Sequence, residues 1–187
     1  GDESIGIYVD DFILDSDNLE RLVDELREAG FTLDGFDEIG EGHPPVKFNG
    51  VQIEVIRGED GIPYLKEHCE DFITKLLAKC QGIPHLGKSV HPHRDSPYVE
   101  VPKDAYEEES EILAGLMEMK RQKMKIEVDC HGVVAACLYA ARTSRPDIAV
   151  VVGMLCQHVS KWSKASDVLL RRLIEYLSST AYKGIHN

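Results

Sequence analysis

The spacing of apolar residues changes near Glu67, and this change constrains the fold more than any other feature of the sequence. Before it, apolar residues form short β-prone runs, and within residues 47–56 they alternate with polar ones. After it, they recur at the three- to four-residue spacing of an amphipathic helix. The pattern predicts an α+β chain, with a small antiparallel sheet and one helix in residues 1–66 and an all-helical bundle in residues 67–187.

Two adjacent acidic residues, Asp10 and Asp11, separate the first two β-prone runs, residues 5–9 and 12–14. Two such runs with two turn-forming residues between them predict a tight hairpin with Asp10 and Asp11 at its tip. A helix is predicted next, because apolar residues at positions 19, 22, 23 and 26 share one helical face. Ser16 or Asp17 is its expected cap and Gly30 its expected end.

The remaining elements follow from the same two periodicities. We expect a strand over residues 47–56, a turn at residues 57–61 and a partner strand at residues 62–65. Residues 82–104 contain four prolines and are predicted to form an extended connector. The predicted helices of the second part cover residues 67–80, 106–124, 130–142, a stretch beginning near Pro146, and 165–178.

Charge is distributed unevenly along the chain, which has 21 basic and 33 acidic residues and a net charge of −12. Residues 1–60 hold 17 acids and 4 bases, whereas residues 142–187 hold 7 bases and 3 acids. A basic surface is therefore expected near the C-terminus despite the negative total. No apolar run of about 18 residues exists, so no membrane partner is expected. Five scattered cysteines predict buried, reduced thiols in a reducing compartment.

The Asp10–Asp11 pair brings two like charges into close proximity, and each carboxylate raises the pKa of the other unless a cation lies between them. A divalent metal satisfies this need, and oxygen ligands suit Mg²⁺. Paired metal ions of this kind support phosphoryl transfer, in which they activate the attacking oxygen and stabilise the leaving one. The alternative is that both aspartates simply form a polar turn.

The chain reads YVDD at residues 8–11, KFNGVQI at residues 47–53 and TSRPDIA at residues 143–149. In this order, these segments resemble the family of reverse transcriptases of copia-type retrotransposons. Residues 8–11 (YVDD) resemble its catalytic hairpin, and residues 47–53 (KFNGVQI) resemble its primer grip. Residues 64–77 resemble the helix that enters the thumb. The most specific similarity lies in residues 137–139 (CLY), 143–149 (TSRPDIA) and 151–155 (VVGML), and residues 170–180 resemble the last thumb helix.

The resemblance implies a fold and a function. Residues 1–66 would be the C-terminal part of a polymerase palm and residues 67–187 a thumb. The complete enzyme would be an RNA-directed DNA polymerase that adds deoxynucleotides to a primer by two-metal chemistry. Asp10 and Asp11 would be its catalytic Mg²⁺ ligands. The residues expected to contact the primer are Tyr8, Val9, Phe48, Asn49 and Gly50, and those expected to contact the nucleic-acid backbone are Lys161, Lys164, Arg171 and Arg172.

The resemblance also implies partners: an RNA/DNA template–primer duplex, and the fingers, upstream palm and RNase H region of the same polyprotein. The implied location is intracellular, in a cytoplasmic particle or the nucleus. The chain begins Gly1-Asp2-Glu3 without an initiator Met, and we expect it to be a piece of a longer protein, or a processed product, that is inactive alone. A third catalytic aspartate would lie upstream.

Other functions stay open on the sequence. The chain could be a decayed or repurposed fragment that binds nucleic acid or a protein without catalysis, or a small acidic interaction module. His91 and His93 with Cys80, or the pair Cys130-His131, could suggest zinc, but their spacing does not match a structural zinc site. Trp162 could stack on a base, although a partly buried packing role is expected instead.

Overall fold

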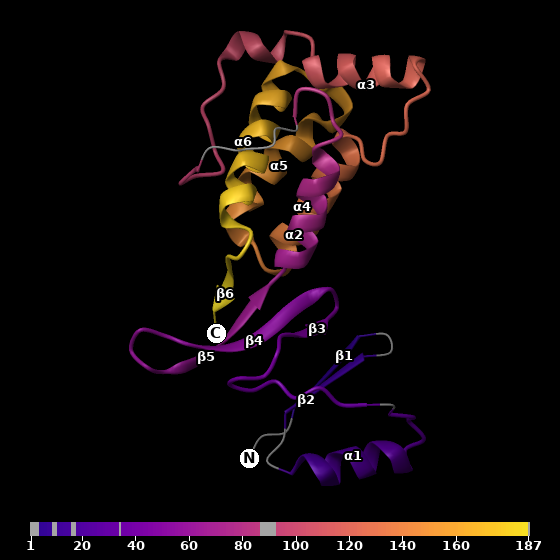
Figure 1. The fold of residues 1–187 in the computed structure, drawn as a ribbon, viewed down its shortest axis with the longest axis vertical. Coiled ribbons are helices and arrows are strands. Elements are labelled where there is room, and N and C mark those ends of the chain that lie inside the picture. The colour runs from indigo at the N-terminus through magenta and orange to yellow at the C-terminus, as the bar shows by residue number, and fades with distance from the viewer. Residues whose placement is uncertain (1–3, 9–10, 16–17, 34, 87–92, 187) are drawn as a thin grey trace. The chain divides into compact units, whose positions relative to one another are not determined.

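The computed structural model describes residues 4–8, 11–15, 18–33, 35–86 and 93–186 (Figure 1). The chain divides into two compact units, residues 1–66 together with residue 187, and residues 67–186. The division falls where the hydrophobic periodicity changes. The first unit combines strands with one helix and the second is mostly helical, so the expected α+β class is confirmed.

The first unit begins with the expected hairpin. Strands β1 (Ser4–Tyr8) and β2 (Asp11–Asp15) pair antiparallel, with Tyr8 opposite Asp11. The hairpin is confirmed, but its expected turn is wrong by one residue. Because Asp11 pairs with Tyr8, it belongs to β2, and the connecting residues are Val9 and Asp10, which lie outside the described residues.

Helix α1 (Leu19–Glu28) follows and buries one apolar face. Its cap is Asn18, whose side-chain oxygen accepts the backbone N–H of Arg21 at 3.2 Å. The expected caps Ser16 and Asp17 lie outside the described residues, and since Asn18 makes the capping bond the prediction is wrong. The helix ends as expected at Gly30, which has a φ of +94° that glycine adopts without steric cost.

The expected single strand over residues 47–56 is wrong, because it is split by a second tight turn. Strands β3 (Val46–Phe48) and β4 (Val51–Arg57) form an antiparallel hairpin in which Phe48 lies opposite Val51. The two connecting residues, Asn49 and Gly50, have φ values of +50° and +77°. An Asn-Gly pair favours this type I′ geometry, since both residues tolerate positive φ and the turn matches the twist of the strands.

Strand β5 (Pro63–His68) is the expected partner strand, entered through a turn in which Gly58 N–H donates to the Ile62 carbonyl at 2.9 Å. It continues past Glu67, so the helix expected there begins later, as α2 (Glu70–Cys80). The strand order is β3-β4-β5-β6. Strand β6 (Gly184–His186) was not predicted, because three residues are too few to show a periodicity. The expectation that residues 67–187 are all-helical is therefore wrong at this end.

Gly184 allows β6 to lie close to β5. A Cβ placed there would be 2.2 Å from the Glu67 carbonyl oxygen. Because this oxygen belongs to the backbone, the clash cannot be relieved by a change of side-chain rotamer. We therefore expect Gly184→Ala to lower the free energy of unfolding by about 1–3 kcal/mol, as overpacking does. Urea denaturation tests this. The control is Gly153→Ala, since Gly153 lies in a helix with nothing within 4 Å of a built Cβ. The control should be stabilising, and a Gly184→Ala protein as stable as the wild type would contradict the expectation.

The second unit is a helical bundle with short 3-10 turns between some of its helices. Helices α4 (Cys130–Thr143), α5 (Ala149–His158) and α6 (Lys164–Thr180) match the three expected helices, and a 3-10 turn (Pro146–Ile148) leads into α5. The expected helix over residues 106–124 is wrong at its start. A 3-10 turn (Lys103–Tyr106) comes first, and α3 (Glu111–Arg121) begins after Ser110, whose hydroxyl oxygen accepts the Leu113 N–H at 2.9 Å.

The core of this unit is apolar and draws on every helix from α2 to α6. Helix α6 runs through it, and its buried side chains include Leu169, Leu170, Leu173, Ile174 and Leu177. Within the described residues, no helix combines the length and the apolar character that crossing a bilayer requires.

The five cysteines are all unpaired thiols. Four are buried, as expected, but Cys156 is exposed, so the prediction is wrong for that residue. Burial raises the pKa of Cys80 and of Cys130 to about 12, so both thiols stay protonated at neutral pH.

Candidate functional site

The candidate catalytic residues lie in and beside the β1–β2 hairpin. Its register brings Tyr8 opposite Asp11 and leaves two residues, Val9 and Asp10, to connect the strands. Val9 and Asp10 lie outside the described residues, and so does the side chain of Asp11. The structure therefore describes the two paired strands, including the backbone of Tyr8 and of Asp11.

Oxygen ligands of the kind that Asp10 and Asp11 offer fit Mg²⁺ in chemical type. Two carboxylates alone, however, supply only part of the six oxygen ligands that Mg²⁺ takes. Among the described residues, no group of three or more His, Cys, Asp or Glu side chains lies together in a way that could hold a metal ion. A site at this hairpin would thus need at least one ligand besides the acidic pair and water.

The residues that resemble the primer grip form the second hairpin. Phe48 ends β3 and is partly buried, whereas Asn49 and Gly50 are exposed at the turn. At an exposed two-residue turn, contact with a partner can be made by backbone N–H and C=O groups and does not require a side chain. Both hairpins belong to the first unit.

The four basic residues expected to contact a nucleic-acid backbone lie on or just before α6, and three of them contact the chain itself. Lys164 Nζ lies 2.5 Å from Glu108 Oε2. Arg171 Nη2 lies 2.8 Å from Glu111 Oε2, and its Nε donates to the His85 carbonyl at 2.8 Å.

Arg172 Nε donates to the Ser96 carbonyl at 2.8 Å. Lys161, in contrast, is exposed and makes no hydrogen bond or ion pair with any part of the chain that the structure describes. Of the four expected contacts, Lys161 alone therefore has its charge unengaged within the described residues. Whether the other three contact a nucleic acid depends on their release from Glu108, Glu111 and the Ser96 carbonyl.

These ion pairs affect both partners. The hydrogen bond from Arg171 holds the pKa of Glu111 below its usual value, and the hydrogen bond to Glu108 holds the pKa of Lys164 above its own. Sequence reasoning missed Glu108 and Glu111. The available signal was opposite charge, since residues 95–111 contain seven acids and one base, while residues 161–172 are mainly basic.

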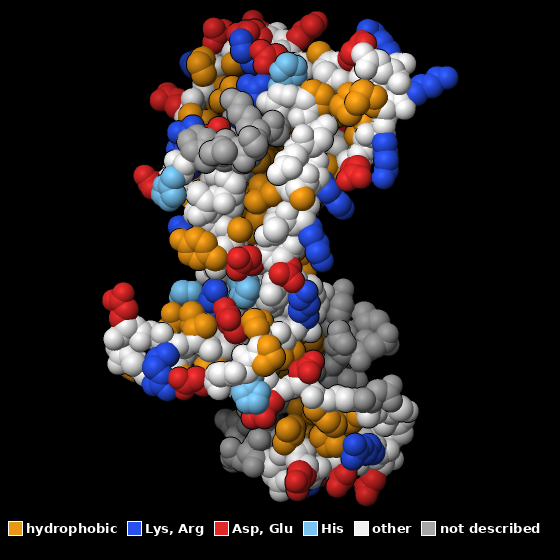
Figure 2. Space-filling model, in the orientation of Figure 1, with side chains coloured by type: hydrophobic (Ala, Val, Ile, Leu, Met, Phe, Trp, Pro, Cys, Tyr) orange, Lys and Arg blue, Asp and Glu red, His pale blue; other side chains and the backbone are white. Residues whose placement is uncertain are grey.

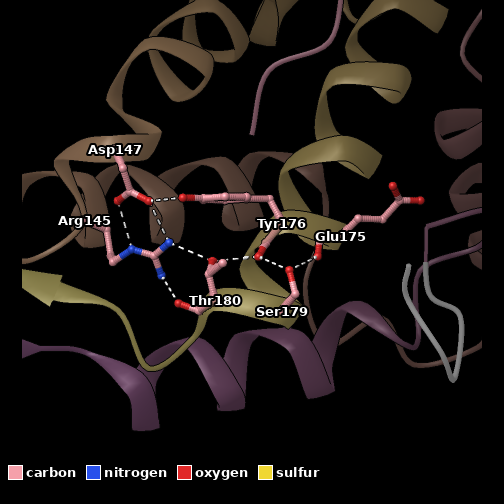
Figure 3. Close-up of polar contacts among 6 residues, drawn as sticks. All are labelled: Arg145, Asp147, Glu175, Tyr176, Ser179 and Thr180. Carbon is pink, nitrogen blue, oxygen red and sulfur yellow. Dashed lines mark hydrogen bonds and ion pairs between the residues drawn. The ribbon is translucent and has the colours of Figure 1, made fainter. Parts of the chain in front are cut away.

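The segment with the most specific family resemblance folds into a polar cluster around the buried Arg145, in which the Asp147 side chain stays partly exposed (Figure 3). Arg145 is only 1% exposed, and its Nε and Nη2 donate to the two carboxylate oxygens of Asp147 at 2.9 and 2.8 Å. Its Nη1 donates to the Thr180 carbonyl at 2.8 Å, and Nη2 also donates to the Thr180 hydroxyl at 2.9 Å. The Tyr176 hydroxyl donates to Asp147 at 2.7 Å.

This Arg145 cluster joins the α4–α5 connection to the C-terminal end of α6, where a cation also offsets the negative end of the helix dipole. Burial raises the pKa of Asp147, but the hydrogen bonds from Arg145 and Tyr176 outweigh burial and hold that pKa below its usual value. Both members of the pair therefore stay charged near neutral pH. The polar side chains of Arg145 and Asp147 therefore have their hydrogen-bond partners within the chain.

A second buried polar group seats α3 against α6. Asp167, at 0% exposure, accepts hydrogen bonds from Ser110 Oγ at 2.7 Å, from Trp162 Nε1 at 2.8 Å and from the Ile112 backbone N–H at 3.2 Å. Trp162 is partly buried against the core, so its expected packing role is confirmed. Such a carboxylate orders the start of α3 because it satisfies donors that the first turn leaves open.

No family model, no curated protein and no solved structure shows significant similarity to the chain. The resemblance described above therefore depends on the residues of this sequence alone.

Proposed function

We propose that the chain is the C-terminal palm and thumb of a copia-type RNA-directed DNA polymerase. The observation that carries the proposal is the β1–β2 hairpin, which pairs Tyr8 with Asp11 and so has the sequence YVDD at its turn. A short hairpin restricts the movement of the residues at its turn, as the ligands of a catalytic metal site require. The family resemblance of residues 143–149 supports the proposal independently.

In the proposed enzyme, Asp10 and Asp11 hold Mg²⁺ together with an aspartate from an upstream strand, and Asp10 is the principal ligand of the two. When bound, Mg²⁺ supplies charge that activates the primer 3′-hydroxyl and stabilises the departing pyrophosphate. Tyr8 and Val9 lie beneath the primer terminus, while Phe48, Asn49 and Gly50 position the primer strand. The hairpin's task is to fix the distance between carboxylates and primer.

The helical unit serves as the thumb in this proposal and contacts the backbone of the template–primer duplex. Backbone contacts position a protein on a duplex without reading its sequence, as a polymerase requires. Lys161 is the basic residue best placed for such a contact, because its side chain is exposed and has no partner among the described residues.

Hybrid binding by the 187-residue chain tests the proposal. We expect it to bind an RNA–DNA hybrid at 50 mM salt through Lys161 and at most one further phosphate contact, so binding should weaken roughly 3- to 12-fold at 200 mM. Lys161→Gln should weaken binding at low salt. The matched control is Lys75→Gln, an exposed lysine of α2 in the same unit that lies outside the proposed contact. Failure of the chain to bind at 50 mM salt, with or without Mg²⁺, would contradict the proposed thumb.

A second candidate function has one observation in its favour. Lys164, Arg171 and Arg172 contact their own chain, as a decayed or repurposed fragment without a nucleic-acid partner would allow. Such a fragment would fold and bind a protein or a nucleic acid without catalysis. Primer extension by the parent polypeptide separates the two candidates, since only the polymerase predicts synthesis that depends on Asp10.

A further inference from the structure

Residues 95–111, here called the acidic strap, run beside α6 and end at Glu111, the first residue of α3 (Figure 1). The strap contains seven acidic residues and one basic residue. Figure 2 shows acidic side chains gathered over the 3-10 turn and the start of α3, with basic side chains among them. The strap is thus a strongly anionic segment that lies against the helix expected to bind an anionic partner.

Apolar contacts anchor the strap to the helical unit. Val99 and Val101 are partly buried against the core, and Ala105 is buried. At its far end, Ser110 donates a hydrogen bond to the buried Asp167 of α6. The backbone of the strap is therefore fixed independently of its charged side chains, and changing those side chains leaves its course in place.

The charged side chains of the strap meet basic side chains of α6. Lys164 pairs with Glu108 at 2.5 Å and Arg171 pairs with Glu111 at 2.8 Å. The 41% exposure of the Lys164 side chain and the 33% exposure of Arg171 show that both pairs are open to solvent. Solvent screens exposed ion pairs of this kind, so they add little to stability and an anion of higher charge density can displace them. A nucleic-acid duplex is such an anion.

We propose that Lys164 and Arg171 form a phosphate-binding surface that the acidic strap covers, so that the strap and a nucleic-acid duplex compete for it. The inference rests on the proposed function and adds regulation to it. In the free protein, Glu108 and Glu111 occupy the positions beside Lys164 and Arg171 that two phosphates of the duplex would otherwise occupy. The strap lowers affinity for duplexes at low salt and makes binding less sensitive to salt, since two cations are already neutralised.

A charge-matched pair of double variants tests the competition. Glu108→Gln with Glu111→Gln releases both bases, whereas Glu107→Gln with Glu109→Gln makes the same change in net charge at exposed acids without ion pairs among the described residues. We expect the first variant to bind an RNA–DNA hybrid on the order of tenfold more tightly than the second at 50 mM salt. Its plot of log affinity against log salt should be steeper by about two.

Removing the bases completes the test. Lys164→Gln with Arg171→Gln should change the affinity of the wild type less than about twofold, but should abolish the gain in the Glu108→Gln/Glu111→Gln background. Lys164→Gln alone provides the same comparison without disturbing the bond from Arg171 to the His85 carbonyl. Thermal unfolding checks that every variant is folded.

Two results would overturn the competition. If the two double variants bind the hybrid equally, net charge alone sets the affinity. If Lys164→Gln weakens binding by the wild type as much as it weakens binding by the Glu108→Gln/Glu111→Gln variant, the strap does not cover the surface. In either case the wild type still binds and the proposed function stands. If no variant binds at 50 mM salt, both proposals fail.

Discussion

Asp10→Asn in the parent polypeptide is expected to reduce Mg²⁺-dependent primer extension by at least about 1,000-fold, while binding to the RNA–DNA hybrid is retained. The neutral amide cannot replace a carboxylate as a ligand for a divalent cation, so the charge that stabilises the reacting phosphate is lost. Losing one well-placed electrostatic partner of a transition state costs roughly 100- to 1,000-fold, and losing a metal as well costs more. Single-turnover primer extension measures this directly.

The control for Asp10→Asn is Asp37→Asn, the same change at an exposed residue of the same unit. It should leave primer extension within about twofold of the wild type. Asp11→Asn gives an intermediate loss if Asp11 only adjusts the site. Synthesis at the wild-type rate by the Asp10→Asn variant would refute the polymerase assignment, and absence of synthesis by the wild-type parent would favour the decayed fragment.

Arg145→Met is expected to lower the free energy of unfolding of the helical unit by about 3 kcal/mol. Removing one member of a buried ion pair costs about 3–5 kcal/mol, because the partner is left charged without its counterion. The lower end applies here, since the Asp147 side chain keeps 35% exposure. The Thr180 carbonyl also loses a donor. Urea denaturation followed by circular dichroism measures the loss.

The control is Arg142→Met, an exposed arginine of α4 without an ion pair among the described residues, which should change stability by less than about 0.5 kcal/mol. Equal stability of the two variants would show that the Arg145 cluster contributes nothing. Asp147→Leu in the Arg145→Met background should restore part of the loss, because no unpaired charge then remains.

The same cluster predicts a pH dependence. The pKa of Asp147 is lower in the folded chain than its usual value, so its ion pair stabilises the fold above the usual carboxyl pKa. That stabilisation is lost as the pH falls through the lowered folded pKa. The Arg145→Met variant should therefore lose less stability than the wild type between pH 5 and about pH 2. Parallel stability curves for the two proteins would contradict this.

Local signals predicted most elements correctly, and the errors occurred at element ends, at a turn inside one expected strand and at the short strand β6. Helices α4, α5 and α6 carry strong apolar periodicity and lie where it places them. The Asn49-Gly50 turn was also present in the sequence as a hairpin signal, but the alternation on either side of it favoured one continuous strand. The start of α3 was misjudged because an acidic run precedes Ser110 without a periodicity of its own.

The sequence by itself determined the division into a β-containing and a helical part, the acidic pair after Tyr8 and most helices. These features depend on residue spacing and on turn-forming residues within short stretches of sequence, so they can be recognised without the tertiary structure. Only the tertiary structure decided which charges meet: Lys164 binds Glu108 across 56 residues, and Arg145 binds Thr180 across 35. Packing of the apolar core brings such residues together, and no local pattern encodes that choice.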